Sequence, residues 1–394
     1  MQYCCHLPAR SEIDKPAIRI LVLNDQSSVN SAASGVGSVV AARLAIEDFG
    51  GKIGNRPIDL ISYDHQNKAD VASALARRAF DVDGVDAAFD FSNSAVSLAV
   101  QELARERGKV VVHVGSANAD LFGKACSATS ALWLYDTYSL AQGIVKAAVQ
   151  DGGKNWFFLT SDYSFGRTME TEATKVLQSQ GGTSLGAVRH PPGTADFASF
   201  LLQAKATDPQ VVGLASGGDD PINIMKQASD FGFDRSRTKF AVFIFALNYV
   251  KALGPRAAQG LQYLSGFYWD RNKDTAAFAK RFAAANGGAY PTEMQAGNYS
   301  AVRHYLQAVS AANSVDGLTV MRKMKAMPLD DFFAPGATIR SDGRLMNDQY
   351  LLEGKAPNEI KGEWDLLTVR QTIKAEDIQR PIDQGGCQHL DEGR

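Results

Sequence analysis

Short apolar runs alternate along the chain with longer segments in which apolar residues recur at helical spacing. Continuous runs of Val, Ile, Leu and Phe are typical of strands buried on both faces, and the spaced segments are typical of helices that cover them. The pattern therefore predicts βαβ units around parallel sheets. The predicted strands are 18–24 (IRILVLN), 58–63, 85–91 and 110–114 in a first series, and 156–160 (WFFLT), 183–188, 211–215 and 239–245 in a second.

Predicted helices follow most of these strands, and the pattern pauses twice, at 132–138 (LWLYDTY) and at 264–270 (LSGFYWD). The helical segments are one around Val39 after the polar loop 25–37, then 71–80, one from Ser94, one ending at Val149, 169–176, 197–204, 222–231, 275–286, 294–313 and 319–327. Strands are predicted again at 349–353 and 364–373. Two series of strands imply two α/β domains, which suits 394 residues, a length at which a single core usually stops growing.

Composition narrows the class of protein. Hydrophobic residues make up 45% and charged residues 21% of the chain, as in ordinary globular proteins, and no apolar run approaches the roughly 20 residues that a bilayer crossing needs. A net charge of -2 without a long basic run argues against binding to nucleic acid or to an anionic membrane.

The N-terminus and the cysteines bear on the cellular compartment. The first residues, MQYCCHLPARSEIDKPA, contain no apolar signal core, which fits either a cytoplasmic protein or an exported one whose signal was removed. Cys4 and Cys5 are adjacent, Cys126 and Cys387 are isolated, and no Cys or His spacing suggests a metal site. In an oxidising compartment we expect a disulfide between Cys126 and Cys387, which both lie in loop-like, glycine-containing segments.

The segment 85–102 (VDAAFDFSNSAVSLAVQE) predicts a strand, a turn and a helix. The turn holds Ser92, Asn93 and Ser94, where the first backbone N–H groups of the helix lack intrahelical partners and the helix dipole is positive. Such a helix start can bind a carboxylate. The alternative is that Ser92 or Asn93 only caps the helix.

No motif assembles a catalytic set. Gly35-Val36-Gly37-Ser38 follows its strand by a long loop and so lacks the tight turn of a dinucleotide-binding site, and neither a P-loop nor an HExxH sequence is present. The six histidines are scattered, and His65, in a loop, is interpreted as structural. We therefore expect a protein that is not an enzyme and that uses no cofactor and no metal. Aromatic residues at the strand ends belong either to the core or to a ligand pocket.

Taken together, several segments resemble the substrate-binding proteins of ABC importers, in the branch that binds branched-chain amino acids and aromatic acids. The segments are IRILVLND, GGKIGNRPIDLISYDHQNKAD, FDFSNSAVSLAVQELARERGKV, GSANADLFGKACS, WFFLTSDYSFG and HYLQAVSAAN, and the similarity runs from about Ile18 to about Cys387. The resemblance implies a type I periplasmic binding protein fold: two doubly wound α/β lobes joined by three hinge crossings. The implied division is 17–136 with 268–345 for lobe I, 137–267 with 346–390 for lobe II, and 1–16 as a poorly ordered extension.

The resemblance also implies a ligand site in the cleft. The residues at the matching positions are Asn93, Ser94, Ser116, Ala117 and Asn118 in the first lobe, and Tyr163, Phe165, Gly217, Gly218, Asp219 and Phe245 in the second. The first loop, SSVNSAASGVG, lacks a tyrosine that many relatives carry, so contacts from 30–34 stay open. The implied protein is a periplasmic monomer that binds a small molecule, presents it to a permease in the inner membrane and does not bind nucleic acid. A transcriptional regulator of this fold would need a helix-turn-helix module, and the stretch before Ile18 is too short for one.

The ligand class follows from the end of the predicted strand 239–245. Relatives that bind branched-chain amino acids place an acidic residue there to pair with the ligand's ammonium group, whereas this chain reads Phe243-Ile244-Phe245-Ala246. A buried ammonium without an anionic partner is costly, and phenyl rings suit a flat apolar body. We therefore expect an aromatic carboxylate of the benzoate, hydroxybenzoate or phenylpropenoate type. A branched-chain amino acid is the alternative, because Asp219 could pair with an ammonium group.

Overall fold

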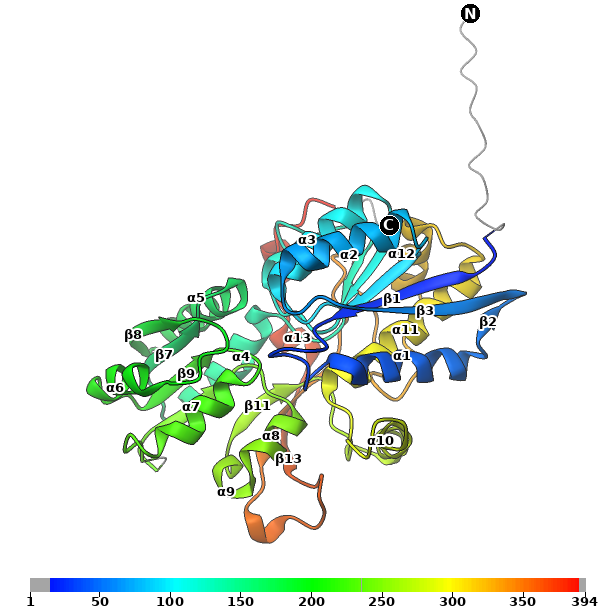
Figure 1. Ribbon diagram of the computed structural model, residues 1–394. Coiled ribbons are helices and arrows are strands. Elements are labelled where there is room, and N and C mark those ends of the chain that lie inside the picture. Colours follow the sequence, from blue (N-terminus) through cyan, green and yellow to red (C-terminus); the bar gives the residue numbers. More distant parts are fainter. Residues whose placement is uncertain (1–14, 235, 390–394) are drawn as a thin grey trace, which may run out of the picture.

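The computed structural model describes residues 15–234 and 236–389. It has two α/β units, called lobe I and lobe II here, which lie at the right and left of Figure 1. Lobe I is the six-stranded sheet, in the order β2-β3-β1-β4-β5-β6, with its helices. Its first part contains β1 Ile18–Asn24, α1 Gly35–Phe49, β2 Lys52–Ile53, β3 Arg56–Asp64, α2 Ala69–Asp81, β4 Ala87–Asp90, α3 Ser94–Glu106, β5 Val110–His113, the 3-10 helix η2 Ala119–Phe122 and β6 Ser130–Leu132. Its second part contains α10 Lys273–Ala285, α11 Glu293–Ala312 and α12 Gly317–Ala326.

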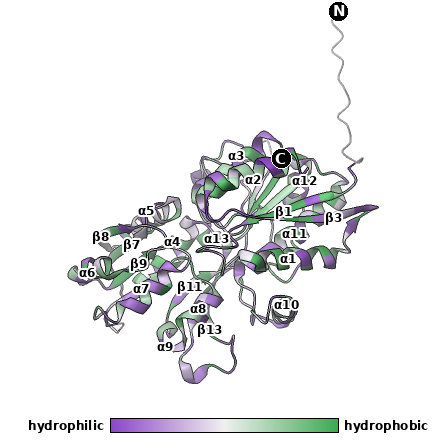
Figure 2. Cartoon of the chain, viewed as in Figure 1, coloured by the Kyte–Doolittle hydropathy of each residue, from purple (hydrophilic) through white to green (hydrophobic). Residues whose placement is uncertain are grey.

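Strand β1 shows why this sheet is covered on both faces. Ile18, Ile20 and Val22 belong to the core on the side of α1 and α11, while Leu21 and Leu23 belong to the core under α2 and α3. Side chains alternate along a strand, so an unbroken apolar run feeds two cores at once. Figure 2 shows the strands mainly in the hydrophobic colour and the loops mainly in the hydrophilic one.

Lobe II is the all-parallel sheet β10-β9-β7-β8 with its helices. Its elements are α4 Thr137–Gln150, β7 Asn155–Ser161, α5 Ser164–Ser179, β8 Thr183–His190, α6 Ala198–Ala206, β9 Val211–Ala215, α7 Asp220–Ala228, β10 Lys239–Val242, α8 Leu247–Leu253 and α9 Pro255–Ala258. The predicted α/β fold with parallel sheets is confirmed. One strand was predicted too long, because the chain bends after Val242 and Phe243 to Ala246 lie outside β10.

A third, antiparallel sheet follows the order β11-β12-β13. Its strands are β11 Gln262–Ser265, β12 Gln349–Gly354 and β13 Leu367–Ile373, and the remaining elements are the 3-10 helices η3 Pro357–Glu359 and η4 Ile382–Gln384 and the helix α13 Ala375–Ile378. Before β12, Leu345 donates its N–H to the carbonyl of Leu132 at 2.9 Å, so this segment extends the sheet of lobe I next to β6. The residue boundaries assigned to the lobes from the resemblance stay a prediction.

The C-terminal segment leads back from lobe II to lobe I. Ile378 packs on α4 of lobe II, where Gly143 leaves room for it. A few residues later Cys387 forms a disulfide with Cys126 in lobe I, as the sequence predicts. This segment is a covalent link between the lobes in addition to the three crossings that were expected.

Candidate functional site

A small cavity of about 30 Å³ lies between the carboxyl ends of the two parallel sheets, where α/β proteins bind ligands. It collects most of the residues that the sequence suggested, from both lobes. The residues that line it are Asn30, Ala33, Ser92, Asn93, Ser94, Gly115, Ser116, Ala117, Tyr163, Phe165, Gly217, Gly218, Ile244, Tyr249 and Met294.

The turn before α3 forms the floor on the side of lobe I. Asp90 and Phe91 both have positive φ angles, 87° and 61°, which are uncommon for residues other than glycine and which cluster at functional sites. The carboxylate of Asp90 is buried below the turn and accepts a hydrogen bond from Asn24 Nδ2 at 2.8 Å, and burial raises its pKa to about 6. Gly115 approaches it closely, because a Cβ at this position would lie 2.7 Å from Asp90 Oδ1.

Asn93 caps helix α3, as the alternative interpretation of the sequence proposed. Its Oδ1 accepts hydrogen bonds from the N–H groups of Ala95 at 2.8 Å and Val96 at 3.2 Å. These donors are therefore occupied, while the N–H of Ser94, the first residue of the helix, has no intrahelical acceptor. The hydroxyl of Ser94 lies 3.5 Å from that of Ser116, at the outer limit of a hydrogen bond. The turn thus brings the hydroxyls of Ser94 and Ser116 together at the cavity.

The loop after β1 supplies Asn30, whose participation the sequence left open. The buried carboxylate of Asp25 accepts hydrogen bonds from the N–H groups of Ser28 and Asn30, both at 2.9 Å, and so fixes the loop. Asn30 Nδ2 donates to Asn67 Oδ1 at 3.2 Å. One side of the cavity is therefore held in place by a carboxylate that does not line it.

Lobe II contributes the larger aromatic surface. Tyr163 and Phe165 come from the start of α5, with ring centroids 6.0 Å apart, and Tyr249 comes from α8. Burial is the main cause that raises the pKa of the Tyr163 and Tyr249 hydroxyls, so both stay protonated at neutral pH. These residues offer ring surface and neutral hydroxyl groups to the cavity.

The lobes touch across the cleft. Asn118 Nδ2 of lobe I donates to Ser164 Oγ of lobe II at 2.8 Å, and Asn248 Nδ2 of lobe II donates to the carbonyl of Ala32 at 2.6 Å. Gly218 also lies against lobe I, since a Cβ there would be 2.6 Å from the carbonyl oxygen of Val29. These contacts describe a closed cleft, which explains the small volume of the cavity.

Three predicted site residues do not line the cavity. Asn118 caps η2 and makes the contact with Ser164, so its amide is used to join the lobes. Asp219 is exposed at the start of α7. Phe245 is fully buried against the rings of Tyr249 and Tyr263.

The bend after β10 explains the position of Phe245. It turns the rings of Phe243 and Phe245 into the core and leaves Ile244 between them facing the cavity. Alternation along the segment could have identified Ile244. Tyr249 and Met294 could not have been found this way, because they come from helix starts remote in sequence whose patterns only indicate core positions.

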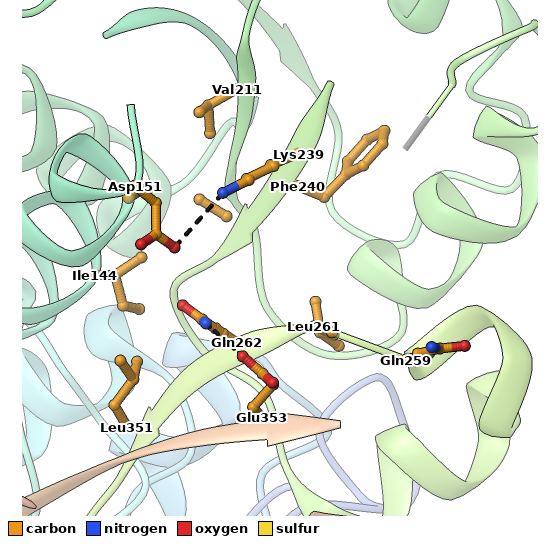
Figure 3. Close-up of a pocket in the computed structure, with 13 residues that line it drawn as sticks. Ile144, Asp151, Val211, Lys239, Phe240, Gln259, Leu261, Gln262, Leu351 and Glu353 are labelled. Carbon is orange, nitrogen blue, oxygen red and sulfur yellow. Dashed lines mark hydrogen bonds and ion pairs between the residues drawn. The ribbon is translucent and has the colours of Figure 1, made fainter. Parts of the chain in front are cut away.

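A larger cavity, of about 290 Å³, lies between α4 and β10 of lobe II and the antiparallel strands β11 and β12 (Figure 3). Two polar pairs lie at its rim. Lys239 Nζ lies 3.5 Å from Asp151 Oδ2, and Gln262 Nε2 donates to Glu353 Oε2 at 2.6 Å. Lys239 is the first residue of β10, so this cavity is at the amino ends of the strands, away from the edge where ligands bind in α/β sheets. The smaller cavity between the lobes is therefore the candidate site.

Comparisons with known proteins agree with this geometry. The family model described as "Periplasmic binding protein" matches residues 17–359. A branched-chain amino acid ABC transporter periplasmic ligand-binding protein from Burkholderia xenovorans LB400 is 40% identical, with a TM-score of 0.85 over 95% of this chain and 100% of that one. A periplasmic binding protein from Burkholderia mallei is 38% identical, with a TM-score of 0.91 over 95% of this chain and 99% of that one.

A third structure shares the fold at much lower identity. It is an ABC transporter solute-binding protein from R. palustris in complex with benzoate, 18% identical, with a TM-score of 0.82 over 94% of this chain and 99% of that one. At this identity the similarity concerns the fold. Among the described residues, no helix combines the length and apolar character that a bilayer crossing requires.

Proposed function

The chain belongs to the periplasmic binding protein family, and from that premise we propose that its ligand is a small aromatic carboxylate of the benzoate, hydroxybenzoate or phenylpropenoate type. Members of this family are solute-binding proteins of ABC transporters rather than enzymes. In the proposed role the protein is an extracytoplasmic monomer that closes around the ligand and presents it to a permease.

The observation that carries the ligand class is the neutral lining of the cavity. None of the described residues that line it is an Asp, Glu, Lys, Arg or His. A carboxylate can be bound by neutral donors at a helix start, where the dipole is positive. The ammonium group of an amino acid would be buried without an anionic partner, at a cost of several kcal/mol.

The carboxylate is proposed to bind at the start of α3. The hydroxyls of Ser94 and Ser116 lie together there, and both side chains are buried, so hydrogen bonds to a charged oxygen would be little screened by water. Ala117 and the backbone of Asn93 complete this end of the proposed site. The capping role of Asn93 orients the helix start for this purpose.

The aromatic ring is proposed to bind between the lobes. Tyr163, Phe165 and Tyr249 offer faces and edges to a ring, and Ile244 and Met294 offer apolar contacts. Gly218 allows lobe II to approach lobe I, because it carries no side chain beside Val29, and Gly217 leaves room for the hydroxyl of Tyr163. A hydroxyl on the ring would find the tyrosine hydroxyls nearby.

A branched-chain amino acid is the second candidate. It is favoured by the 40% identical protein from B. xenovorans, which is described as part of a branched-chain amino acid transporter. Its ammonium group would require Asp219, and that side chain is exposed outside the cavity. The solute-binding proteins from R. palustris in complex with benzoate and 4-hydroxybenzoate have the same fold and bind ligands of the class that we propose.

A thermal-shift panel distinguishes the two candidates. Protein unfolded, dialysed and refolded to remove any bound ligand is mixed with 4-hydroxybenzoate, 4-coumarate, leucine, isoleucine or valine. A ligand that binds only the folded state at 100 times its Kd adds about 2.7 kcal/mol of stability, which raises the midpoint by several degrees. We expect the aromatic acids to stabilise the protein, and stabilisation by the amino acids alone would contradict the proposal.

The anchor is tested with serine variants. Ser94→Ala together with Ser116→Ala removes hydrogen bonds to a buried anion, each worth roughly 1.5 to 3 kcal/mol, and should weaken binding by about tenfold or more per bond. Ser97→Ala is the matched control, because this buried serine of α3 donates to the carbonyl of Phe91 and does not line the cavity. Equal affinities of the double variant and the control would exclude the anchor.

A further inference from the structure

The loop between β3 and α2 holds a buried histidine directly behind the cavity. Gln66 and Asn67 in this loop have φ angles of 52° and 58°, an uncommon pair of left-handed residues without glycine. Two side chains hold this conformation, one from the end of β3 and one from the loop itself. Asp64 Oδ1 accepts from the N–H of Gln66 at 2.8 Å, and His65 Nδ1 accepts from the N–H of Asn67 at 3.0 Å.

The ring of His65 has one protonation state that fits these contacts. Because Nδ1 accepts a hydrogen bond, the single ring proton of a neutral imidazole is on Nε2. Nε2 faces Ser92 Oγ at 3.5 Å, which also accepts from the N–H of Asp25 at 2.9 Å. The ring is fully buried, and this burial lowers the pKa of His65 to about 4 although the nearby carboxylates of Asp25 and Asp64 oppose the shift.

Asn67, which His65 holds, connects to two residues of the cavity. Its Oδ1 accepts from Asn93 Nδ2 at 2.7 Å and from Asn30 Nδ2 at 3.2 Å. Asn93 caps α3, and Asn30 belongs to the loop after β1. A single amide oxygen therefore joins two of the lobe I segments that line the cavity, although Asn67 does not line it.

We propose that His65 is a positioning residue for ligand binding: it fixes Asn67, and Asn67 holds the side-chain amides of Asn30 and Asn93 in place at the edge of the cavity. The proposal rests on the proposed function, because it concerns the same site. A histidine with a purely structural role would contribute to stability without affecting the position of these amides. Ligand affinity and hydrogen exchange of the loop after β1 distinguish the two roles.

Protonation of His65 would break the arrangement. An imidazolium carries hydrogen on both nitrogens, so Nδ1 could no longer accept from the N–H of Asn67. The titratable groups that face the ring are Asp25 from the end of β1 and Asp64 from the end of β3, and Ser92 faces it from the turn before α3. Protonation of His65, near its pKa of about 4, should therefore release Asn67, after Asp90 with its pKa of about 6 has already been protonated.

Two variants separate the contacts of the ring. His65→Asn puts an oxygen where Nδ1 lies and keeps an acceptor for Asn67, whereas His65→Gln puts an amide near Nε2 and loses that acceptor. We expect His65→Asn to bind within about threefold of the wild type and His65→Gln to bind about tenfold more weakly, the effect of one lost hydrogen bond. His304→Gln is the control: His304 is also buried in lobe I, and its Nε2 contacts the carbonyl of Met324 at 2.9 Å, away from the cavity.

The assay combines calorimetric titration with hydrogen exchange. Affinity is measured with 4-hydroxybenzoate and, separately, with leucine. The wild type alone then shows whether the proposed ligand class is wrong, and the comparison of the variants with the wild type tests the role of His65. Hydrogen exchange of residues 26–34 in ligand-free protein gives a readout that needs no ligand, and we expect faster exchange there in His65→Gln than in His65→Asn or His304→Gln. The proposal is overturned if this loop exchanges equally fast in His65→Gln and His304→Gln. It is also overturned if the two variants have equal affinity for whichever ligand the wild type binds.

Discussion

The link between Cys126 and Cys387 gives a quantitative test of the fold. The perturbation is Cys387→Ser in a background in which Cys4→Ser and Cys5→Ser remove the other thiols, so that thiol exchange with them is eliminated. Residues that precede Cys387 are held independently of the disulfide: Ile378 is buried on α4, and Arg340 Nη2 donates to the carbonyl of Arg380 at 2.8 Å. The native segment should therefore keep its position when the disulfide is absent.

The magnitude follows from the length of chain that the disulfide closes. The two cysteines are 261 residues apart, and chain entropy alone gives about 5 to 6 kcal/mol for a loop of this size. Measured effects are usually smaller, about 2 to 4 kcal/mol, because the unfolded chain keeps some structure. We expect Cys387→Ser to lower the free energy of unfolding by about 3 kcal/mol.

Urea unfolding of ligand-free protein measures this difference. The midpoint should fall, and the slope with urea should rise slightly because the unfolded chain without its cross-link exposes more surface. Cys126→Ala with Cys387→Ser is the control for a free buried thiol, and it should behave like the single variant. A change below about 0.5 kcal/mol would refute the reasoning, since it would mean that the link does not constrain the unfolded chain.

Three further predictions concern buried ionisable groups and the closed cleft. Arg344→Met leaves the buried carboxylate of Asp136 without its partner and should cost about 3 to 5 kcal/mol in urea unfolding, most of which Asp136→Asn should restore; no loss would contradict this. Asn248→Ala removes the hydrogen bond to the carbonyl of Ala32 and should weaken ligand binding about two- to tenfold by calorimetry at unchanged stability, whereas unchanged affinity would argue against the closed contact. Burial raises the pKa of Glu293 to about 7, so its contribution to stability is present below its unfolded pKa near 4.5 and is lost as pH rises to 7. Glu293→Gln should remove this fall in thermal stability between pH 4.5 and 7. If the melting temperature of the variant fell with pH in parallel with that of the wild type, the raised pKa of Glu293 would be contradicted.

The strands of the fold could be predicted because their signal is local. Strand β1 occupies the predicted residues, since an apolar run without polar interruptions fits few structures other than a buried strand. The hairpin strand β2 Lys52–Ile53 was missed, because two residues are too few for any period to appear. The predicted end of β10 was wrong for a related reason: Phe243 to Phe245 stay apolar through the bend, and hydrophobicity does not record where a backbone turns.

The site was predictable to the extent that it follows strand ends. Ser94 and Ser116 line the cavity because the loops after parallel strands meet at one edge of the sheet. The sequence could not decide whether Asn93 caps the helix or faces a ligand, since one amide side chain suits both roles, and the structure shows it capping. Tyr249 is brought to the cavity by packing between distant segments, which leaves no trace in local periodicity.

The most direct test of the account is the crystal structure of protein refolded without ligand and then saturated with 4-hydroxybenzoate. We predict density for the acid in the cavity between the lobes, with its carboxylate within hydrogen-bond distance of Ser94 and Ser116 and its ring beside Tyr163 and Tyr249. Density in the lobe II cavity of Figure 3 instead would contradict the assignment of the site. An empty cleft under these conditions, together with a leucine complex whose ammonium group pairs with Asp219, would contradict the ligand class.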